Sequence, residues 1–147
     1  MLHVRCQAHA TLDDKGRVAL PAPLRRALAE AGEAQLVLTF HKGAVWGWRP
    51  VDFEREVEAP LSAADPFADD VNDFAHSLLA PAQDVEIDKA GRIRIPPPLR
   101  DLAALDRDVV VNSLLNRVEI WDRAAWDDRF KQSLERQKST SGMPGRQ

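Results

Sequence analysis

The sequence predicts an α+β fold, mainly β with flanking helices, in which two tandem half-barrels of one design form a single pseudo-dimeric barrel. An internal repeat, the alternation of apolar residues in short segments and the small size of each copy support this prediction. A unit of about 50 residues with four short strands has a small core and open sheet edges. Within a chain of 147 residues, the two copies are therefore expected to interlock rather than to fold separately.

The repeat consists of two pairs of matching stretches. Residues 12–25 match residues 87–100 at an offset of 75, with identical Asp, Gly, Arg, Pro and Leu positions. The offset then shortens to 73, where residues 36–39 align with residues 109–112. The shift follows a short helix, where a change in loop length costs little. We assign the first repeat to 1–56, an acidic helical connector to 57–80, the second repeat to 81–125, and a C-terminal helix with a disordered tail to 126–147.

Each copy is expected to begin with two strands joined by a turn that contains glycine. The first strand runs to about Leu12 in one copy and Ile87 in the other. In the second strand, apolar residues alternate with others, which is typical of a strand with one buried face. The predicted inward positions are Val18, Leu20, Ile93 and Ile95, and the outward positions are Arg17, Ala19, Arg92 and Arg94.

A short helix and a hairpin complete each copy. A proline ends the second strand, because it cannot donate a hydrogen bond to the ladder, and proline also suits the first turn of a helix. We therefore expect helices at about 23–31 and 98–104. In the hairpin that follows, the turn residue is expected to be Gly43 or Asn116, since both types tolerate a positive φ.

Two helical segments are predicted outside the repeats. Asp65 and Pro66 are typical of a helix start, with Asp as the N-cap. Asp122 is expected to cap a helix after the second copy, and the tail from about Arg136 is expected to be disordered. The first apolar stripe fits packing against a neighbouring molecule and a core role equally well. The stripes are Phe67, Val71, Phe74 and Leu78 in the first helix, and Trp126, Phe130 and Leu134 in the second.

The net charge of −3 conceals an uneven distribution of charge. Residues 52–73 hold eight acids and one base, so this segment carries −7 and the rest of the chain +4. We interpret these acids as a solvated helical face, which would also repel DNA from that side of the molecule. The repeated modules are mildly basic, which is compatible with binding to nucleic acid.

The candidate binding motif is the turn between the first two strands of each copy. Asp13 and Asp88 begin these turns, where a carboxylate can accept hydrogen bonds from backbone N–H groups. Gly16 and Gly91 are expected to adopt a backbone conformation that other residues resist. We interpret these four residues as structural parts of the turns.

The arginine after each glycine has two interpretations, which the sequence leaves open. Arg17 and Arg92 either form an ion pair with the aspartate of the same turn or present a guanidinium to a phosphate or a guanine edge. Arg94 shares the outward face of Arg92, and Lys15 and Lys89 lie in the turns. These cations predict a basic surface for a DNA groove. Lys89 and Arg94 together make the second loop the more basic of the two.

Other conspicuous side chains receive structural interpretations. The tryptophans at strand ends and on helix stripes are expected in the core. Arginines on a helix surface are more often solvated than bound, although phosphate contacts are the alternative. The arginines on the short helices are Arg25, Arg26 and Arg100.

The double motif resembles the MraZ family. The Asp-x-Lys-Gly-Arg block that begins at Asp13, its repetition at Asp88 and the tryptophan after each hairpin carry the resemblance, which covers about residues 4–130. The resemblance implies two AbrB-like (SpoVT-AbrB) repeats, swapped-hairpin barrels and ring-shaped homo-oligomers. It also implies a transcriptional regulator of the division and cell-wall gene cluster that binds repeated promoter sites, with Arg17 and Arg92 in contact with double-stranded DNA.

The sequence departs from the family pattern at two places. Val4 and Cys6 stand where the family often has a Phe-x-Gly segment, and Ala90 stands where the first motif has Lys15. The two loops are therefore expected to read DNA unequally.

Two other functions are considered. The runner-up is an antitoxin-like or scaffold barrel that binds a partner protein, with the acidic segment as its surface. The third is an acid–base enzyme that pairs Asp13 with Asp88, which the neighbouring arginines disfavour. The histidines lack metal-ligand spacing, and no cofactor-binding or nucleophile motif occurs. We therefore predict no enzymatic activity, no cofactor and no metal.

The same features predict a location. No run of about 18 apolar residues occurs, and the N-terminus lacks the apolar region of a signal peptide. The single cysteine, Cys6, cannot form an internal disulfide. We expect a cytoplasmic, nucleoid-associated protein without a membrane segment.

Overall fold

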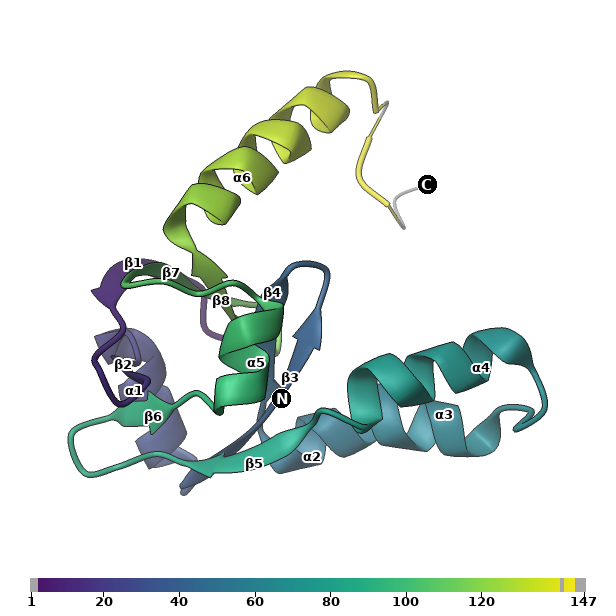
Figure 1. Cartoon of the computed structure of the whole chain (residues 1–147), viewed down its shortest axis with the longest axis horizontal. Helices are drawn as coiled ribbons and strands as arrows, with labels where there is room; N and C mark the ends of the chain where they lie inside the picture. The colour runs from purple at the N-terminus through teal and green to yellow at the C-terminus, as the bar shows by residue number, and fades with distance from the viewer. Residues whose placement is uncertain (1–2, 141, 145–147) are drawn as a thin grey trace.

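The computed structural model describes residues 3–140 and 142–144, and its largest element is a six-stranded antiparallel sheet (Figure 1). A separate two-stranded ladder pairs β2 (Arg17–Ala19) with β6 (Arg92–Arg94). The prediction of a mainly β protein with helices is confirmed. The six-stranded sheet contains, in spatial order, β1 (Cys6–Thr11), β7 (Asp108–Leu114), β8 (Arg117–Asp122), β4 (Ala44–Trp48), β3 (Gln35–His41) and β5 (Gln83–Glu86).

The two copies exchange their first strands. Strand β1 of the first copy pairs with β7 of the second, and β5 of the second copy pairs with β3 of the first. Equivalent strands meet at the centre, with Val45 opposite Ile120 in one sheet and Val18 opposite Ile93 in the other. The pairing relates the copies by a pseudo-twofold axis. Among the described strands, β1 and β5 lie at the outer edges, so the six-stranded sheet is open.

A single hydrophobic core fills the space between the two sheets. The predicted alternation is confirmed, because Val18, Leu20, Ile93 and Ile95 are all almost completely buried. They join one cluster with apolar residues of the six-stranded sheet. Because both copies supply this cluster, neither copy has a complete core of its own. The other members from that sheet include Leu36, Leu38, Val45, Val109, Val111, Val118 and Ile120.

Two short helices cover the ends of this core. Helix α1 spans Ala22–Glu30 and α5 spans Pro97–Leu102, each one residue earlier at its start than predicted. In both helices the proline that ends the preceding strand occupies the N-cap position. Leu24, Leu28 and Leu99 anchor the helices to the core.

The two hairpin turns differ in their left-handed residue. In the first hairpin, Lys42 and Gly43 have φ values of +48° and +89°, as expected for a turn with glycine. In the second, Asn116 lies in the turn as predicted, but the positive φ belongs to Leu115, at +55°. The amide of Asn116 instead donates a hydrogen bond to the Glu56 carboxylate, at 3.0 Å, which ties this turn to the helical connector.

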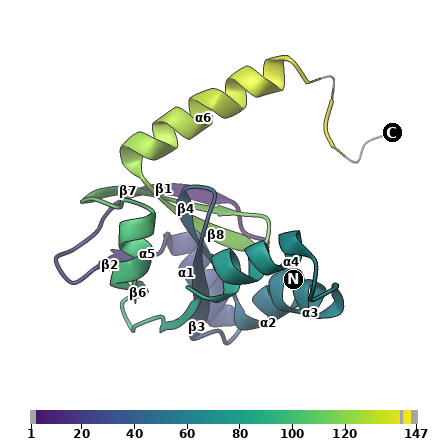
Figure 2. The ribbon, with the colours of Figure 1, turned by 45° about the vertical axis from the view of Figure 1, so that its right-hand side comes forward.

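Residues 50–79 form a helical arm that projects from the two sheets and contains most of the predicted connector (Figures 1 and 2). The outgoing half is α2 (Pro50–Phe53), the π-helical η1 (Glu54–Glu58) and α3 (Ala59–Ala63). The returning half is α4 (Asp69–Phe74) and η2 (Ala75–Leu79). The helix of the returning half begins at Asp69, so the predicted start with Asp65 as N-cap is wrong. The Asp65 carboxylate instead accepts the N–H of Phe67 within a turn that precedes the helix. Phe67 is 89% exposed and therefore does not join a core stripe.

The base of the arm packs on the outer face of the sheet. Val37, Trp48, Phe53 and Val57 form a second buried cluster there, and the Thr39 hydroxyl donates to the carbonyl of Leu78 at 2.8 Å.

One acid of the segment 52–73 is an exception to the predicted solvated face. Asp52 is completely buried and accepts hydrogen bonds from Arg49 Nε at 2.7 Å and Arg55 Nη2 at 2.5 Å. Burial alone raises the pKa of this carboxyl, but the hydrogen bonds and charges of the two arginines hold its pKa below the ordinary value. Asp52 is therefore a charged structural group.

A third helical feature, α6 (Arg123–Lys138), projects from the end of β8 (Figure 2). Trp126 packs on Trp121 with ring centroids 5.8 Å apart, and Phe130 stacks on Trp126 at 5.6 Å. The helix continues beyond Arg136, where disorder was predicted. Asp122 lies at the N-cap, but its carboxylate accepts the N–H of Asp106 at 3.2 Å instead of capping the helix.

We expect Asp52→Ala to lower the free energy of unfolding by about 2–3 kcal/mol, near the lower end for a broken buried ion pair, because Arg49 and Arg55 keep some contact with water. Denaturant unfolding followed by tryptophan fluorescence measures this loss. Glu54→Ala, at an exposed acid of the same segment, is the control and should change stability by less than about 0.5 kcal/mol. Equal losses in the two variants would contradict the buried-pair role of Asp52.

Candidate nucleic-acid interface

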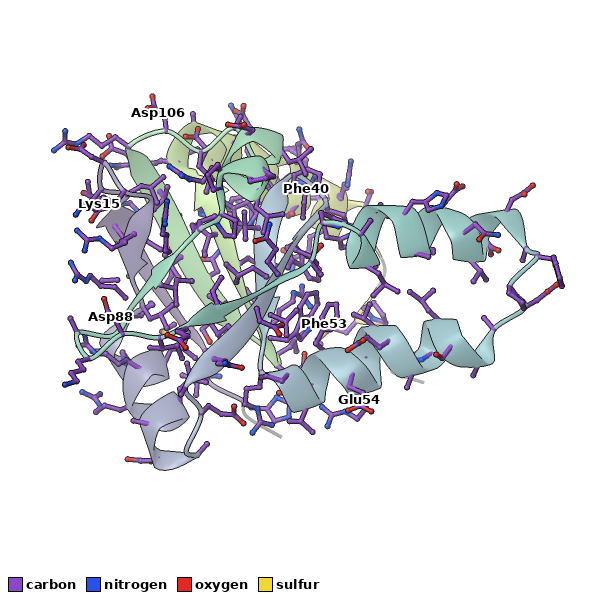
Figure 3. The ribbon with its side chains drawn as sticks, turned by 60° about the horizontal axis from the view of Figure 1, so that its bottom comes forward. Lys15, Phe40, Phe53, Glu54, Asp88 and Asp106 are labelled. Atoms are coloured by element: carbon purple, nitrogen blue, oxygen red, sulfur yellow. The ribbon has the colours of Figure 1, made fainter. Side chains whose placement is uncertain are left out.

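Two loops of the same design lie at one end of the molecule. We call residues 13–17 the first Gly-Arg loop and residues 88–92 the second Gly-Arg loop. Each joins its copy's first strand to a strand of the β2–β6 ladder. The antiparallel pairing places the two loops at opposite ends of this ladder, which is only three residues long, so the loops stay close to each other. Figure 3 shows Lys15 and Asp88 at the same end, away from the helical arm.

The aspartate organises each loop through three hydrogen bonds. Asp13 accepts the backbone N–H groups of Lys15 and Arg17, at 2.9 and 2.8 Å, and also Arg17 Nε at 2.7 Å. Asp88 accepts the N–H groups of Ala90 and Arg92, both at 2.9 Å, and Arg92 Nε at 3.1 Å. The ion-pair interpretation of both arginines is thus confirmed as a structural fact.

These hydrogen bonds keep both carboxylates ionised. The backbone N–H of Arg17 has the largest effect and lowers the pKa of Asp13; burial opposes it, and the Arg17 guanidinium lowers the pKa further. The N–H and guanidinium of Arg92 lower the pKa of Asp88 in the same way. A general acid needs a raised pKa to hold a proton near neutral pH, and the lowered pKa values of the two aspartates do not favour that role.

The glycines accommodate an arginine from the opposite copy. Gly16 and Gly91 have φ values of +79° and +77°, a region that side chains strain to enter. A Cβ on Gly16 would lie 2.7 Å from Cζ of Arg100, and a Cβ on Gly91 would overlap the Arg25 side chain. Glycine is therefore required at these two positions for two reasons, the positive φ and the close packing between the copies.

Backbone hydrogen bonds make the same cross-connection. The N–H of Leu20 donates to the carbonyl of Gly91 at 3.0 Å, and the N–H of Ile95 donates to the carbonyl of Gly16 at 2.8 Å. Each Gly-Arg loop is thus anchored to the end of the other copy's strand.

The five cations expected at the DNA-binding surface lie around the two loops, but one of them, Arg94, contacts a different loop from the one expected. Lys15, Lys89 and Arg94 are exposed, and Arg17 and Arg92 are about one third exposed. Arg94 lies opposite Arg17 in the ladder, and its Nε donates to the Lys15 carbonyl at 3.0 Å. Arg94 therefore reaches the first loop, which corrects its assignment to the second loop alone.

An open groove runs between β5 and β6. Three of the predicted cations, Arg17, Arg92 and Arg94, line it together with the acids Glu86 and Asp88. The groove is the place in the described structure where the predicted cations of the two copies come together.

The arginines of the short helices do not share one role. Arg25 Nη1 donates to the carbonyl of Ala90 at 3.1 Å, and Arg100 lies against Gly16, so neither is merely solvated. Arg26 is exposed.

A further cation beside the first loop, Arg107, was missed from the sequence. The N–H of Leu12 donates to the Arg107 carbonyl at 2.8 Å, which brings this residue of the second copy beside the first loop. It lines a hollow there with Asp13, Lys15 and Arg17. The aligned residue of the first copy is Ala34, so the repeat contains no sign of a cation at this position. With Arg94 and Arg107, the first loop has more cations around it than were predicted for it.

Two other kinds of feature are absent from the described residues. They contain no group of three or more His, Cys, Asp and Glu side chains placed to hold a metal ion. No helix among those described has the length and apolar character needed to cross a membrane.

Comparison with known proteins gives matches over nearly the whole chain. The profile of the family described as "MraZ protein, putative antitoxin-like" matches residues 7–74 and, a second time, residues 78–144. A curated relative from Treponema pallidum is 40% identical over 116 residues, which are 78% of this chain and 76% of the relative. One from Nocardioides sp. is 38% identical over 141 residues, 89% and 93% of the two chains. One from Thiobacillus denitrificans is 33% identical over 127 residues, 86% of each. All three are named "Transcriptional regulator MraZ".

We expect Gly91→Ala to destabilise the protein more than Gly32→Ala. Both glycines have a positive φ, but a Cβ at Gly32 would meet open space, whereas one at Gly91 would displace Arg25. Gly32→Ala should therefore cost only about 1 kcal/mol of backbone strain, and Gly91→Ala about 1–3 kcal/mol more from overpacking. Denaturant unfolding of both variants measures the difference, and equal losses would mean that Arg25 does not pack on Gly91.

Proposed function

The chain belongs to the MraZ family, and from this premise we propose that it is a transcriptional regulator that binds double-stranded DNA sequence-specifically through its two Gly-Arg loops. The shared name of the relatives supports the regulatory part. The β2–β6 ladder supports the DNA-binding part, because it holds the cations of both loops at one end of the molecule. The family resemblance favours the division and cell-wall gene cluster as the target, with action in the cytoplasm at the nucleoid.

The geometry of the Asp–Arg ion pair in each Gly-Arg loop favours DNA binding, because it leaves part of the guanidinium available. It uses only the Nε atoms of Arg17 and Arg92, whereas a guanidinium carries five N–H donors. The terminal Nη groups, on side chains 34% and 39% exposed, have the fork geometry that suits a guanine edge or a phosphate. The aspartate orients each arginine before DNA arrives, which reduces the entropy lost on binding. Lys15 and Lys89 would add phosphate contacts.

We also propose that the two sheets are parts of one swapped-hairpin barrel. SpoVT-AbrB repeats would then span 1–56 and 81–125, with the connector at 57–80 between them. The exchanged strands β1 and β5, the single core and the paired bonds from Leu20 to Gly91 and Ile95 to Gly16 support this arrangement.

A homo-oligomer would give such a protein its affinity. A single pair of loops contacts few phosphates, so binding at repeated promoter sites gains from several linked protomers. A head-to-tail contact between unlike surfaces closes into a ring when the rotation allows it. We propose that α6 of one protomer packs on the helical arm of the next.

Exposed apolar residues and opposite charges support this contact. Phe67 and Phe74 are exposed on the arm, and Phe130 and Leu134 on α6. The arm segment 52–73 carries −7, whereas α6 holds five basic and three acidic residues. Unlike charges on apolar surfaces favour a specific association over aggregation.

The acidic arm also favours a second candidate function. Its exposed phenylalanines and negative charge suit a partner protein with a basic, apolar surface. The family description includes antitoxin-like proteins, which is compatible with this alternative. DNA binding and partner binding are separated by whether DNA upstream of the gene shifts in a gel at moderate salt.

We expect Arg17→Ala/Arg92→Ala to weaken binding of one protomer to the upstream DNA by at least about 30-fold, because two bidentate contacts of about 1–3 kcal/mol each are lost. Gel-shift titrations at two salt concentrations measure both the affinity and its salt dependence. The slope of log affinity against log salt should become shallower by about 0.9 for each phosphate that the variant no longer neutralises.

Arg5→Ala/Lys42→Asn is the matched control for this experiment. It removes two positive charges at the opposite ends of strands β1 and β3 from the loops, and asparagine tolerates the positive φ of Lys42. If both double variants bind DNA as the wild type does, the loops are not the DNA-binding site.

For the oligomer, we expect charge reversal on either surface to reduce the assembly size. Asp69→Lys/Asp73→Lys on the arm, or Lys131→Glu/Arg136→Glu on α6, places like charges across the contact. A mixture of the two variants should restore an assembly in which they alternate, because each contact then pairs unlike charges, and the four changes in one chain should restore it as well. Light scattering after size-exclusion chromatography measures the mass. An unchanged mass in both double variants would contradict the contact.

A further inference from the structure

The carbonyl that precedes each loop glycine is held by an arginine from the other copy. In the second Gly-Arg loop, the carbonyl of Ala90 accepts Nη1 of Arg25 on α1 at 3.1 Å. In the first loop, the carbonyl of Lys15 accepts Nε of Arg94 on β6 at 3.0 Å. Lys15 and Ala90 are equivalent positions of the repeat. The equivalent carbonyl oxygen of each loop is thus held by an arginine, but the two arginines do not occupy equivalent positions of the repeat.

The repeat makes this difference between the copies plain. The counterpart of Arg94 in the first copy is Ala19, which cannot hold the second loop. The counterpart of Arg25 is Arg100, which packs on Gly16, and its buried Nε has no hydrogen-bond partner within the described residues. Among these four positions, Arg25 restrains the second loop and Arg94 the first.

We propose that Arg25 and Arg94 are positioning residues that hold the Gly-Arg loop of the opposite copy in its DNA-binding conformation. Arg25 acts through the second loop and hence through Arg92. Arg94 acts through the first loop and hence through Arg17. The inference rests on the proposed DNA-binding function of these loops.

The physical basis is the small number of bonds that fix each loop tip. The aspartate carboxylate accepts two N–H groups of the loop and the aspartate carbonyl accepts that of the glycine, but an ionised aspartate has no side-chain donor for the carbonyl before the glycine. A hydrogen bond from a charged donor is stronger than one from a neutral donor, and here it fixes the peptide next to the left-handed glycine. Without it, the arginine two residues later loses part of its orientation.

A double-mutant cycle distinguishes positioning from direct contact with phosphate. We expect Arg25→Ala to weaken DNA binding about tenfold in the wild type and in an Arg17→Ala background, which is the worth of one charge-assisted hydrogen bond. In an Arg92→Ala background, Arg25→Ala should have almost no further effect, because the side chain it positions is gone. A direct phosphate contact would instead contribute equally in all three backgrounds, and that result would overturn the proposal.

The matched control is Arg26→Ala, which removes the same charge from the next position of α1. Arg26 is exposed, and any phosphate contact that it makes should be additive with both Arg17→Ala and Arg92→Ala. For Arg94→Ala the expected coupling is reversed, with an effect that disappears in the Arg17→Ala background and persists with Arg92→Ala. Coupling of Arg25 to Arg17 rather than to Arg92 would contradict the assignment.

Amide hydrogen exchange of the DNA-free protein tests the loops without reference to function. Arg25→Ala should speed exchange in residues 88–92 and leave residues 13–17 unchanged, and Arg94→Ala should do the opposite. Unchanged exchange in both variants would overturn the positioning role. If exchange changes as expected but Arg17→Ala/Arg92→Ala still binds DNA normally, the proposed function fails while the positioning of the loops stands.

Discussion

The exchange of first strands between the two copies is the constraint on which the other features depend. Strand β1 completes the second copy's sheet and β5 completes the first, so each copy lacks a strand until the other has folded. Hydrogen bonding along these strands fixes the register, and the register turns the same apolar residues toward one core. The β2–β6 ladder follows from this arrangement, because the chain leaving each exchanged strand returns across the same end of the molecule. The two Gly-Arg loops are neighbours for that reason.

Interlocking also accounts for the composition of the loops. Each glycine must leave room for an arginine that arrives from the opposite copy, and each glycine carbonyl accepts an N–H from the opposite strand. The loops are therefore parts of the interface between the copies as well as an exposed surface. Their aspartates satisfy the local donors, so the arginines can be exposed on a firm support. Under the proposed function, the same few residues contribute to stability and to DNA recognition.

Features that depend on the local sequence pattern could be predicted from the sequence. Contacts between residues of different copies could not. The alternation in the second strands located Val18 and Ile93 in the core, because a strand's period of two is readable from neighbouring residues. The packing of Arg25 on Gly91, in contrast, joins residues far apart in sequence. The burial of Asp52 was hidden within a run of acids, because its two arginine partners were not distinguishable from solvated ones.

The covalent link between the copies frees them from being identical. A homodimer of one such module must repeat every substitution on both sides of its axis, whereas here Ala19 is the counterpart of Arg94, and Ala34 that of Arg107, within one chain. Near-symmetry of the backbone is kept by the strand pairing, and the side chains around the loops have diverged. The loop-bearing end of the molecule consequently has two distinguishable sides. A polymer that lies across this end would therefore meet the two different sides in a definite order. The side chains thus give the protomer a direction that the nearly symmetric backbone does not define.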